Sequence, residues 1–476
     1  MTRIILDNLI NVAYLFSSIL FILGLKDLSS PKTARRGMLL AALGMFVAVL
    51  GTLLHNKVVS YEWIAVGLVL GTVIGVPMAF WIPMTAVPQR TALSHAFGAL
   101  AVALVGLAEY LNHHGDINEM GSIKMAAIGF EVLLGSMTFT GSLLAAGKLQ
   151  GVLPGSPMTY KGQNVLTFAL LAGMLAVLVY LVIAPGDIVI GEFRITHMYL
   201  FLGLIGLGLL FGVLLVLPIG AADMPVVISI LNSYGGLAAS ATGFVLGNNV
   251  LIIAGALDGG SGFLLSLLMC KAMNRSWANV LFGAFGKAPE ADAAEAQEVT
   301  IREAGVEDVA ALMTSARLVI VVPGYGMAVA QAQHKVRELE DLLEKSGVSV
   351  KYAIHPVAGR MPGHMNVLLA EANIPYDRLH EMDDINPEFA QADVALVIGA
   401  NDVTNPAARH IKSSPIYGMP ILNVDQARTV IVIKRSMNPG FAGIDNELYG
   451  YPNTMMYFGD AKEALNRLIN EIKASA

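Results

Sequence analysis

The amino-acid sequence predicts a bundle of membrane-spanning helices followed by an α/β domain built on a parallel sheet. Only 14% of the 476 residues are charged and 55% are hydrophobic, whereas soluble domains average about 25% charged residues. The charge is also uneven, because residues 1–275 hold 13 of the 30 Lys/Arg and 11 of the 36 Asp/Glu. We therefore expect a transmembrane domain at 1–275, a linker rich in Ala and Glu at 276–308, and an α/β domain at 309–476.

The transmembrane domain is predicted from the length of its apolar stretches. A helix needs about 20 apolar residues to cross a bilayer. The first stretch lacks an A-x-A-like cleavage site, so we interpret it as a retained span. Nine stretches qualify, at roughly 9–25, 37–54, 63–83, 93–111, 125–146, 165–184, 197–218, 224–247 and 249–270.

The orientation follows from the basic residues between these stretches. One side carries nine Lys/Arg, including the four in loop 26–36, and the other side carries four. Cytoplasmic loops carry the excess. We expect an inner-membrane protein whose N-terminus lies outside and whose C-terminal domain lies in the cytoplasm.

Five polar residues within or beside the apolar stretches are candidates for a proton path, because ionisable groups at membrane depth usually line a functional route. His95 suits a proton relay because the unperturbed pKa of histidine is about 6.5, although an interfacial structural histidine is an equal alternative. Asn232 could hold a water or a histidine, or simply pair with another helix. Asp223, followed by Pro225, also fits an ordinary helix N-cap. The other two candidates are Glu131 and Asp258.

The C-terminal part alternates apolar strands with helices. Strand-like runs occur at 318–322, 348–354, 394–399 and 430–433, a helix is expected to follow Val329 and to run through about Lys345, and an amphipathic helix is expected at 461–475. This alternation is typical of a doubly wound parallel sheet.

A glycine-rich turn follows the first of these strands. The sequence from Gly324 to Val329 reads G-x-G-x-x-V, at the position of a dinucleotide-binding fingerprint in Rossmann-like folds. Val329 replaces the usual small third residue, and a tight structural turn remains the alternative.

The type of dinucleotide is suggested by the ends of two other strands. The second strand leads into His355–Arg360 without the carboxylate that binds the ribose of NAD. Lys434, Arg435 and Ser436 follow a later strand and suit a 2′-phosphate, although a solvated basic pair is the alternative. Gly399, Asn401 and Asp402 end another strand and are candidates for ligand contact.

Composition argues against two other classes of site. The net charge of −6 does not favour a nucleic-acid partner. Cys270 is the only cysteine, so we expect no intrachain disulfide and no thiolate metal site.

Several long strings together resemble the β subunit of proton-translocating NAD(P) transhydrogenases over nearly the whole chain. The strings are GAADMPVV (220–227), LNSY (231–234), MCKAMNR (269–275), PGYGMAVAQAQ (323–333), HPVAGR (355–360), PGHMNVLLAE (362–371), GAND (399–402) and KRSMN (434–438).

The resemblance implies a function for the whole chain. It implies NADP(H) bound to this chain, NAD(H) bound to a partner α subunit that adds further membrane helices, and a dimer of such αβ assemblies. Hydride would pass directly between the two nucleotides, coupled to proton translocation, and no side chain of this chain would act as an acid or base in that transfer.

The resemblance also assigns roles to residues. The proton path and its coupling loop match His95, Asn232 and Asp223. The pyrophosphate turn matches Gly324, Tyr325, Gly326, Met327, Ala328 and Val329; further nucleotide contacts match Arg360, Gly399, Asn401 and Asp402; the 2′-phosphate site matches Lys434, Arg435 and Ser436; and a lid matches 437–444.

Three residues depart from the family pattern. Phe441 stands where the lid usually has Tyr, Glu131 lies about one turn from the usual acidic position, and Asp258 replaces a small or apolar residue. We hypothesise that Glu131 and Asp258 help to form the outer proton entry.

An ion channel or antiporter gated by a cytoplasmic nucleotide-binding domain would share this organisation. The sequence contains no TVGYG-like filter, and the shared strings favour the transhydrogenase. A neighbouring gene for an NAD-binding α subunit would separate the two hypotheses.

Overall fold

The computed structural model describes most of the chain, and its residues form two compact units. The first unit comprises Met1–Pro83, Gln89–Ile219 and Val227–Ser266, and the second comprises Met84–Pro88, Gly220–Val226 and Leu267–Ala476. The described residues are 2–55, 60–113, 120–155, 157–184, 188–190, 193–220, 223–282, 301–361, 363–412, 414, 416–438 and 444–475.

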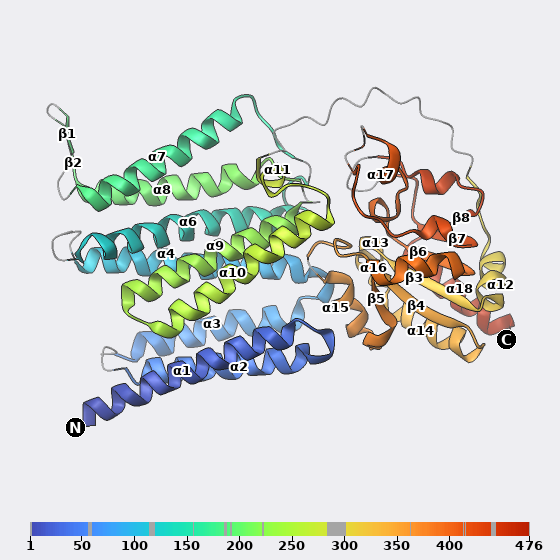
Figure 1. The fold of residues 1–476 in the computed structure, drawn as a ribbon, viewed down its shortest axis with the longest axis horizontal. Helices are drawn as coiled ribbons and strands as arrows, with labels where there is room; N and C mark the ends of the chain where they lie inside the picture. Colours follow the sequence, from blue (N-terminus) through green and yellow to red (C-terminus); the bar gives the residue numbers. More distant parts are fainter. Residues whose placement is uncertain are drawn as a thin grey trace. The chain divides into compact units, whose positions relative to one another are not determined.

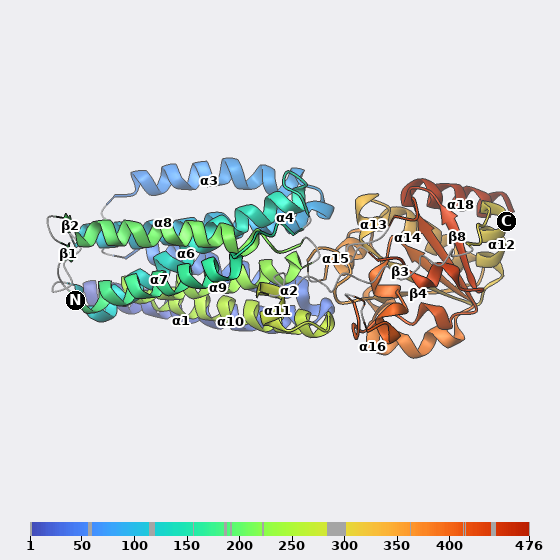
Figure 2. The same cartoon turned by 90° about the horizontal axis from the view of Figure 1, so that it is seen from above.

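Long apolar helices make up the transmembrane part (Figures 1 and 2). Each of the nine predicted stretches corresponds to one of them, and within the described ranges nine helices are long and apolar enough to cross a membrane. They are α1 (Thr2–Leu28), α2 (Pro31–Leu53), α3 (Glu62–Trp81), α4 (Val87–Asn112), α6 (Ser122–Gln150), α7 (Gln163–Ile183), α8 (His197–Val216), α9 (Met224–Leu246) and α10 (Asn249–Ala272).

A short hairpin precedes α8 and was not predicted. Its strands are β1 (Ile188–Ile190) and β2 (Phe193–Ile195), which pair in antiparallel fashion. Strands of three residues are too short to leave a periodic pattern in the sequence.

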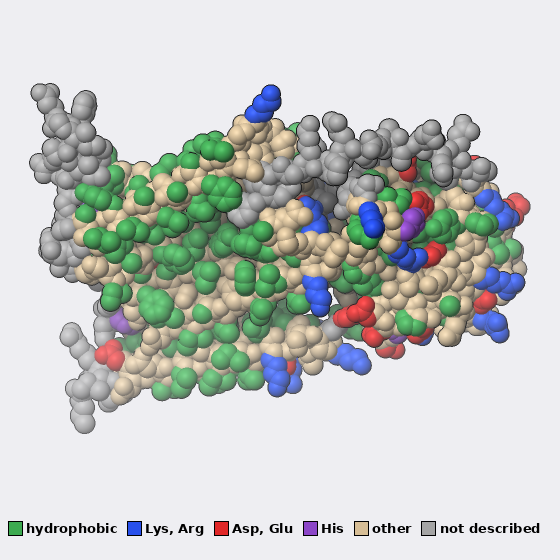
Figure 3. All heavy atoms as spheres, turned by 45° about the horizontal axis from the view of Figure 1, so that its top comes forward, with side chains coloured by type: hydrophobic (Ala, Val, Ile, Leu, Met, Phe, Trp, Pro, Cys, Tyr) green, Lys and Arg blue, Asp and Glu red, His purple; other side chains and the backbone are tan. Residues whose placement is uncertain are grey.

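Small residues allow the membrane helices to pack closely. A Cβ atom on Gly236 of α9 would come within 2.8 Å of the Gly259 Cα of α10, and one on Gly135 of α6 would come within 2.9 Å of the Ala99 oxygen of α4. Close backbone approach of this kind is how helices associate in lipid. Hydrophobic side chains cover the outside of these helices (Figure 3).

A buried lysine joins the ends of two helices. Lys148, in the last turn of α6, is 2% exposed. Its ammonium donates to the backbone oxygens of Leu217 at 2.5 Å and Ile219 at 2.7 Å, and more weakly to that of Val216 at 3.3 Å. These carbonyls lie at the end of α8, where they lack helical partners. The lysine therefore caps α8 from a neighbouring helix.

The second unit contains a six-stranded parallel sheet with the order β5-β4-β3-β6-β7-β8. Taken in chain order this is 3-2-1-4-5-6, the order of a Rossmann-like fold. The four predicted strands are β3 (Leu318–Pro323), β4 (Ser349–Ile354), β6 (Val394–Ile398) and β7 (Thr429–Lys434); the two edge strands, β5 (Leu379–Glu381) and β8 (Thr454–Phe458), were not predicted.

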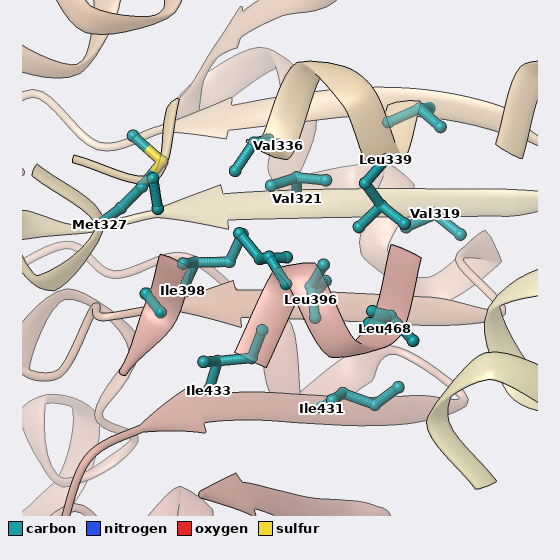
Figure 4. Close-up of a cluster of buried hydrophobic side chains, with 14 of the residues drawn as sticks. Val319, Val321, Met327, Val336, Leu339, Leu396, Ile398, Ile431, Ile433 and Leu468 are labelled. Carbon is teal, nitrogen blue, oxygen red and sulfur yellow. The ribbon is translucent and has the colours of Figure 1, made fainter. Parts of the chain in front are cut away.

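Alternate strand residues point into two separate cores. Val319 and Val321 of β3 belong to one core, whereas Ile320 and Val322 belong to the other. The first core also contains Leu396, Ile433 and Leu468 (Figure 4). Both faces of the sheet are therefore buried, as its uninterrupted apolar strands require. The helices of this unit are α11 (Trp277–Phe282), α12 (Val306–Ser315), α13 (Tyr325–Val329), α14 (Gln333–Lys345), α15 (His364–Glu371), α16 (Met382–Ile385), α17 (Ala407–His410) and α18 (Ala461–Ser475).

The helix predicted to follow Val329 and to run through about Lys345 is α14, whereas the short helix α13 that precedes it was not predicted. Gln331 has a φ of 50°. The amide of Ala332 donates to the Met327 oxygen, and the amide of Gln331 donates to the Ala328 oxygen. These two bonds form a Schellman motif, which ends α13 before α14 begins. A glycine usually marks that position, so the glutamine gave no signal.

We predict that Lys148→Met destabilises the membrane helices. The variant keeps most of the side-chain volume but removes the ammonium that donates to the Leu217 and Ile219 oxygens, at a cost of about 1–3 kcal/mol. Thermal unfolding of the full chain in detergent should show a lower midpoint. Lys161→Met, a change at an exposed lysine, is the control, and equal midpoints for the two variants would contradict the capping role.

Candidate functional site

A cavity of about 550 Å³ opens at the carboxyl ends of the strands in the sheet. Turns that follow five of the six strands line it, and β3 and β6 are the neighbouring strands at which the strand order reverses. Ligands of doubly wound sheets bind at this switch point. The lining residues are Gly324–Gly326, Val357–Gly359, Gly399–Val403, Ile433–Ser436, Asn438 and Gly459–Ala461.

Most of the predicted nucleotide residues meet in this cavity. Those that line it are Gly324, Tyr325, Gly326, Gly399, Asn401, Asp402, Lys434, Arg435 and Ser436. Met327 and Ala328 are instead buried in the core. Val329 is 47% exposed and, like Arg360, is outside the set of lining residues. Phe441 and residues 439–443 of the predicted lid lie outside the described residues.

The glycines of the predicted fingerprint are required by contact between two backbone turns. A Cβ on Gly324 would lie 2.5 Å from the Gly399 oxygen, and one on Gly326 would lie 2.7 Å from the Gly399 Cα. The amide of Gly326 donates to the Gly399 oxygen at 2.9 Å. Gly399 itself has a φ of 64°. This contact accounts for the glycines as a tight structural turn, whether or not a pyrophosphate also binds there.

Lys434 places a cation without a hydrogen-bond partner among the described residues in the cavity wall. Its ammonium is buried and makes no hydrogen bond to the described residues. Burial lowers the pKa of Lys434, and the carboxylates of Asp402 and Asp445 act in the opposite direction. A buried ammonium without a partner is costly, so this wall of the cavity suits an anion.

A polar network joins the loop that contains Asp402 to residues that follow the predicted lid. The Asn401 amide donates to an Asp402 carboxylate oxygen at 3.0 Å, and the Tyr449 hydroxyl donates to the Asn401 side-chain oxygen at 2.5 Å. The Asn446 amide donates to the Asn401 backbone oxygen at 2.9 Å. Tyr449 and Asn446 were not predicted, because an isolated tyrosine or asparagine carries no sequence signal for such a contact.

Two histidines shape the turn after β4. The His355 Nε2 donates to the Pro420 oxygen at 2.8 Å, and its Nδ1 accepts from the Val357 amide at 3.2 Å. The His364 Nδ1 accepts from the Arg360 amide at 3.1 Å. Burial lowers the pKa of each histidine to about 4, so both are neutral at pH 7. The Arg360 guanidinium lies over the Tyr325 ring, 4.2 Å from its centre.

Three predicted proton-path residues interact in the first unit. The Asn232 amide of α9 donates to an Asp258 carboxylate oxygen of α10 at 3.1 Å. Asp258 also acts electrostatically on His95 of α4. The His95 Nδ1 is buried and makes no hydrogen bond to the described part of the chain. The structure thus associates Asp258 with His95 and Asn232.

The other two predicted residues have different surroundings. Glu131 is completely buried in α6, beside the position that a Cβ on Gly106 of α4 would occupy, and Thr242 of α9 faces its carboxylate. Asp223 accepts two hydrogen bonds of 2.7 Å from the Arg275 guanidinium. The Asp223 carboxylate is therefore held in an ion pair with Arg275.

Comparison with known proteins gives a consistent match. The family model for the NAD(P) transhydrogenase beta subunit matches residues 10–471. Two curated sequences named NAD(P) transhydrogenase subunit beta, both from Rhodospirillum rubrum, are 49% identical over 469 residues, which is 97% of this chain and 98% of each relative.

The chain belongs to the NAD(P) transhydrogenase β-subunit family. The predicted resemblance is thereby confirmed over nearly the full length. The apolar helices and the family together make the chain a multi-pass membrane protein with a Rossmann-like domain.

We predict that Gly324→Ala strongly destabilises the Rossmann-like domain of this transhydrogenase subunit. The new methyl group would overlap backbone atoms of Gly399 and Ala400, which cannot move aside as a side chain could, and we expect a loss of about 3 kcal/mol. Chemical unfolding of the full chain would measure it. Gly305→Ala, where only a carboxylate oxygen lies within 4 Å, at 3.6 Å, should change stability little.

We also predict that this domain loses stability as the pH falls from about 6.5 to 4. The pKa of His355 is about 4 in the folded protein and about 6.5 when unfolded, so the unfolded chain binds more protons in this window. The stabilisation is complete above pH 6.5 and is lost on acidification. His355→Gln should reduce the slope of the unfolding free energy against pH; an unchanged slope would contradict the assignment.

Proposed function

We propose that this chain binds NADP(H) in the cavity at the carboxyl ends of β3, β6 and β7. The observation that carries the proposal is the buried Lys434 ammonium, which faces the cavity without a hydrogen-bond partner among the described residues. Arg435 and Ser436 line the cavity beside it and are exposed. Two cations and a hydroxyl are suited to the dianionic 2′-phosphate that distinguishes NADP(H) from NAD(H).

The rest of the cavity supports the same nucleotide. The turn after β4 contributes Val357, Ala358 and Gly359, so no carboxylate from that turn lines the cavity to bind a ribose 2′-hydroxyl or to repel a 2′-phosphate. When bound, the nicotinamide would supply the hydride chemistry. The residues of this chain would bind and orient the nucleotide, and no side chain would act as an acid or base.

The second part of the proposal concerns the partner. The name of the relatives, subunit beta, supports an α-subunit partner. We propose that this partner carries NAD(H) and further membrane helices, in a dimer of αβ assemblies. Hydride transfer requires only that the two nicotinamides be held close together and aligned. We place the Rossmann-like domain in the cytoplasm, the N-terminus outside and the protein in the inner membrane, on the distribution of basic residues.

The third part concerns proton translocation. We propose that protons pass His95, Asn232 and Asp258, with Glu131 nearer the outer surface and Asp223 in the coupling loop. The hydrogen bond between Asn232 and Asp258, and the electrostatic interaction of Asp258 with His95, support a connected group. Coupling then means that protonation changes the affinity for the nucleotide at a distant site.

Nucleotide binding tests the first part. Lys434→Gln should weaken NADP⁺ binding by the full chain about tenfold or more, because a charge-assisted contact to phosphate is lost, and should change NAD⁺ binding little. Isothermal titration calorimetry would measure both. Lys345→Gln, a change at an exposed lysine that does not line the cavity, is the matched control. Equal NADP⁺ affinity in the Lys434 variant and the wild type would refute the 2′-phosphate assignment.

Coupled turnover tests the third part. With the α subunit added, Asp258→Asn and Glu131→Gln should reduce proton uptake per hydride transferred from NADH to an NADP⁺ analogue, and His95→Ala should abolish proton-linked turnover. NADP⁺ binding should survive in all three variants. Normal coupling in both carboxylate variants would remove them from the path, and ion flux without any hydride transfer would favour the gated channel or antiporter.

A further inference from the structure

We infer that Tyr449 is a positioning residue that sets the preference of the cavity for a nucleotide with a 2′-phosphate. Its ring holds the Lys434 ammonium in the cavity wall, and its hydroxyl holds the loop that contains Asp402. The inference rests on the proposed binding of NADP(H) to this chain. Tyr449 is 2% exposed and is not among the residues that line the cavity, so it acts indirectly, through residues that do line it.

The ring of Tyr449 determines where Lys434 can lie. The Lys434 Nζ is 4.8 Å from the centre of this ring, within the range of an attractive cation–π interaction. The ring belongs to the core on one face of the sheet, packed with Leu448, Val432 and Met456. It is therefore a rigid surface, and the flexible lysine is held against it.

The hydroxyl of Tyr449 acts on a different part of the cavity. It donates to the Asn401 side-chain oxygen at 2.5 Å, and the Asn401 amide donates to Asp402 at 3.0 Å. The oxygen that accepts from Tyr449 cannot turn away without breaking both bonds. One side chain thus fixes the cation on β7 and, through Asn401, the carboxylate in the turn after β6.

The separation of these two charges matters for phosphate binding. Asp402 and Asp445 both act electrostatically on Lys434. If the ring were absent, the lysine could move toward either carboxylate, which would then compete with the phosphate for the same cation. The ring therefore keeps Lys434 available to a ligand. A nucleotide without a 2′-phosphate does not contact this cation, so its affinity should not depend on the ring.

Two substitutions separate the ring from the hydroxyl. Tyr449→Leu removes both. It should weaken NAD⁺ binding by the hydroxyl effect alone, and NADP⁺ binding by a further factor of about 5 to 30, the range of a desolvated cation–π contact. Tyr449→Phe keeps the ring and removes the bond to Asn401. It should weaken both nucleotides by a similar factor of about five, leaving their affinity ratio as in the wild type.

The readout is the ratio of NADP⁺ to NAD⁺ affinity of the full chain in detergent, measured by calorimetry. Tyr457 offers a matched control: it is 4% exposed, its hydroxyl donates to the Ala464 oxygen at 3.3 Å, and the Arg467 guanidinium lies 5.5 Å from its ring centre. It does not line the cavity. Tyr457→Leu should leave the ratio unchanged. Tyr449→Met is a second non-aromatic variant, in case Tyr449→Leu does not fold.

The outcomes distinguish this inference from the proposed function. If the non-aromatic variants lower both affinities by the same factor, Tyr449 is merely structural and the inference is overturned. If Tyr449→Phe lowers the ratio as much as Tyr449→Leu, the role of the ring is overturned. If the wild type itself shows no preference for NADP⁺, the proposed nucleotide is wrong, and the inference fails with it.

Discussion

The cavity depends on the close contact between two backbone turns. Gly324 and Gly326 after β3 press against Gly399 and Ala400 after β6, and no Cβ atom fits between them. Because the strand order reverses between these two strands, the crevice opens above this contact. The contact also fixes where the chain turns into Asn401 and Asp402. The positions of the residues that line the cavity therefore depend on glycine at three positions, Gly324, Gly326 and Gly399.

Buried charged side chains in this molecule have two kinds of surroundings, and the difference distinguishes structural groups from the group proposed to bind a ligand. Lys148 donates to three carbonyls, and the buried Glu340 accepts from Arg337, Arg378 and the Tyr352 hydroxyl. Both charges are balanced locally. Lys434 faces a cavity with distant carboxylates and an aromatic ring instead. A charge left available in this way is what ligand binding requires.

The sequence predicted what depends on long patterns. Nine apolar stretches and four buried strands leave a strong periodic or compositional signal, so the nine long apolar helices and the four central strands were predicted. Contacts between individual side chains of different elements leave no such signal in the sequence. The pairing of Asn232 with Asp258, the capping of α8 by Lys148, and the stacking of Lys434 on Tyr449 each join side chains of different elements, at spacings that match no helical or strand period. The glycine-rich turn lies between a strand and a helix, as predicted. Its close backbone contact with Gly399 could not be predicted from the motif.

The lysine cap described at the end of α8 also has a mechanical consequence. α6 and α8 are in close contact, since a Cβ on Gly208 would meet the backbone and a side chain of α6, and the Lys148 ammonium joins the C-terminal ends of the two helices by hydrogen bonds. Sliding one helix past the other would break the cap before it broke any apolar contact. The two helices should therefore move as one rigid body, and any rearrangement of the bundle must take place at its other interfaces.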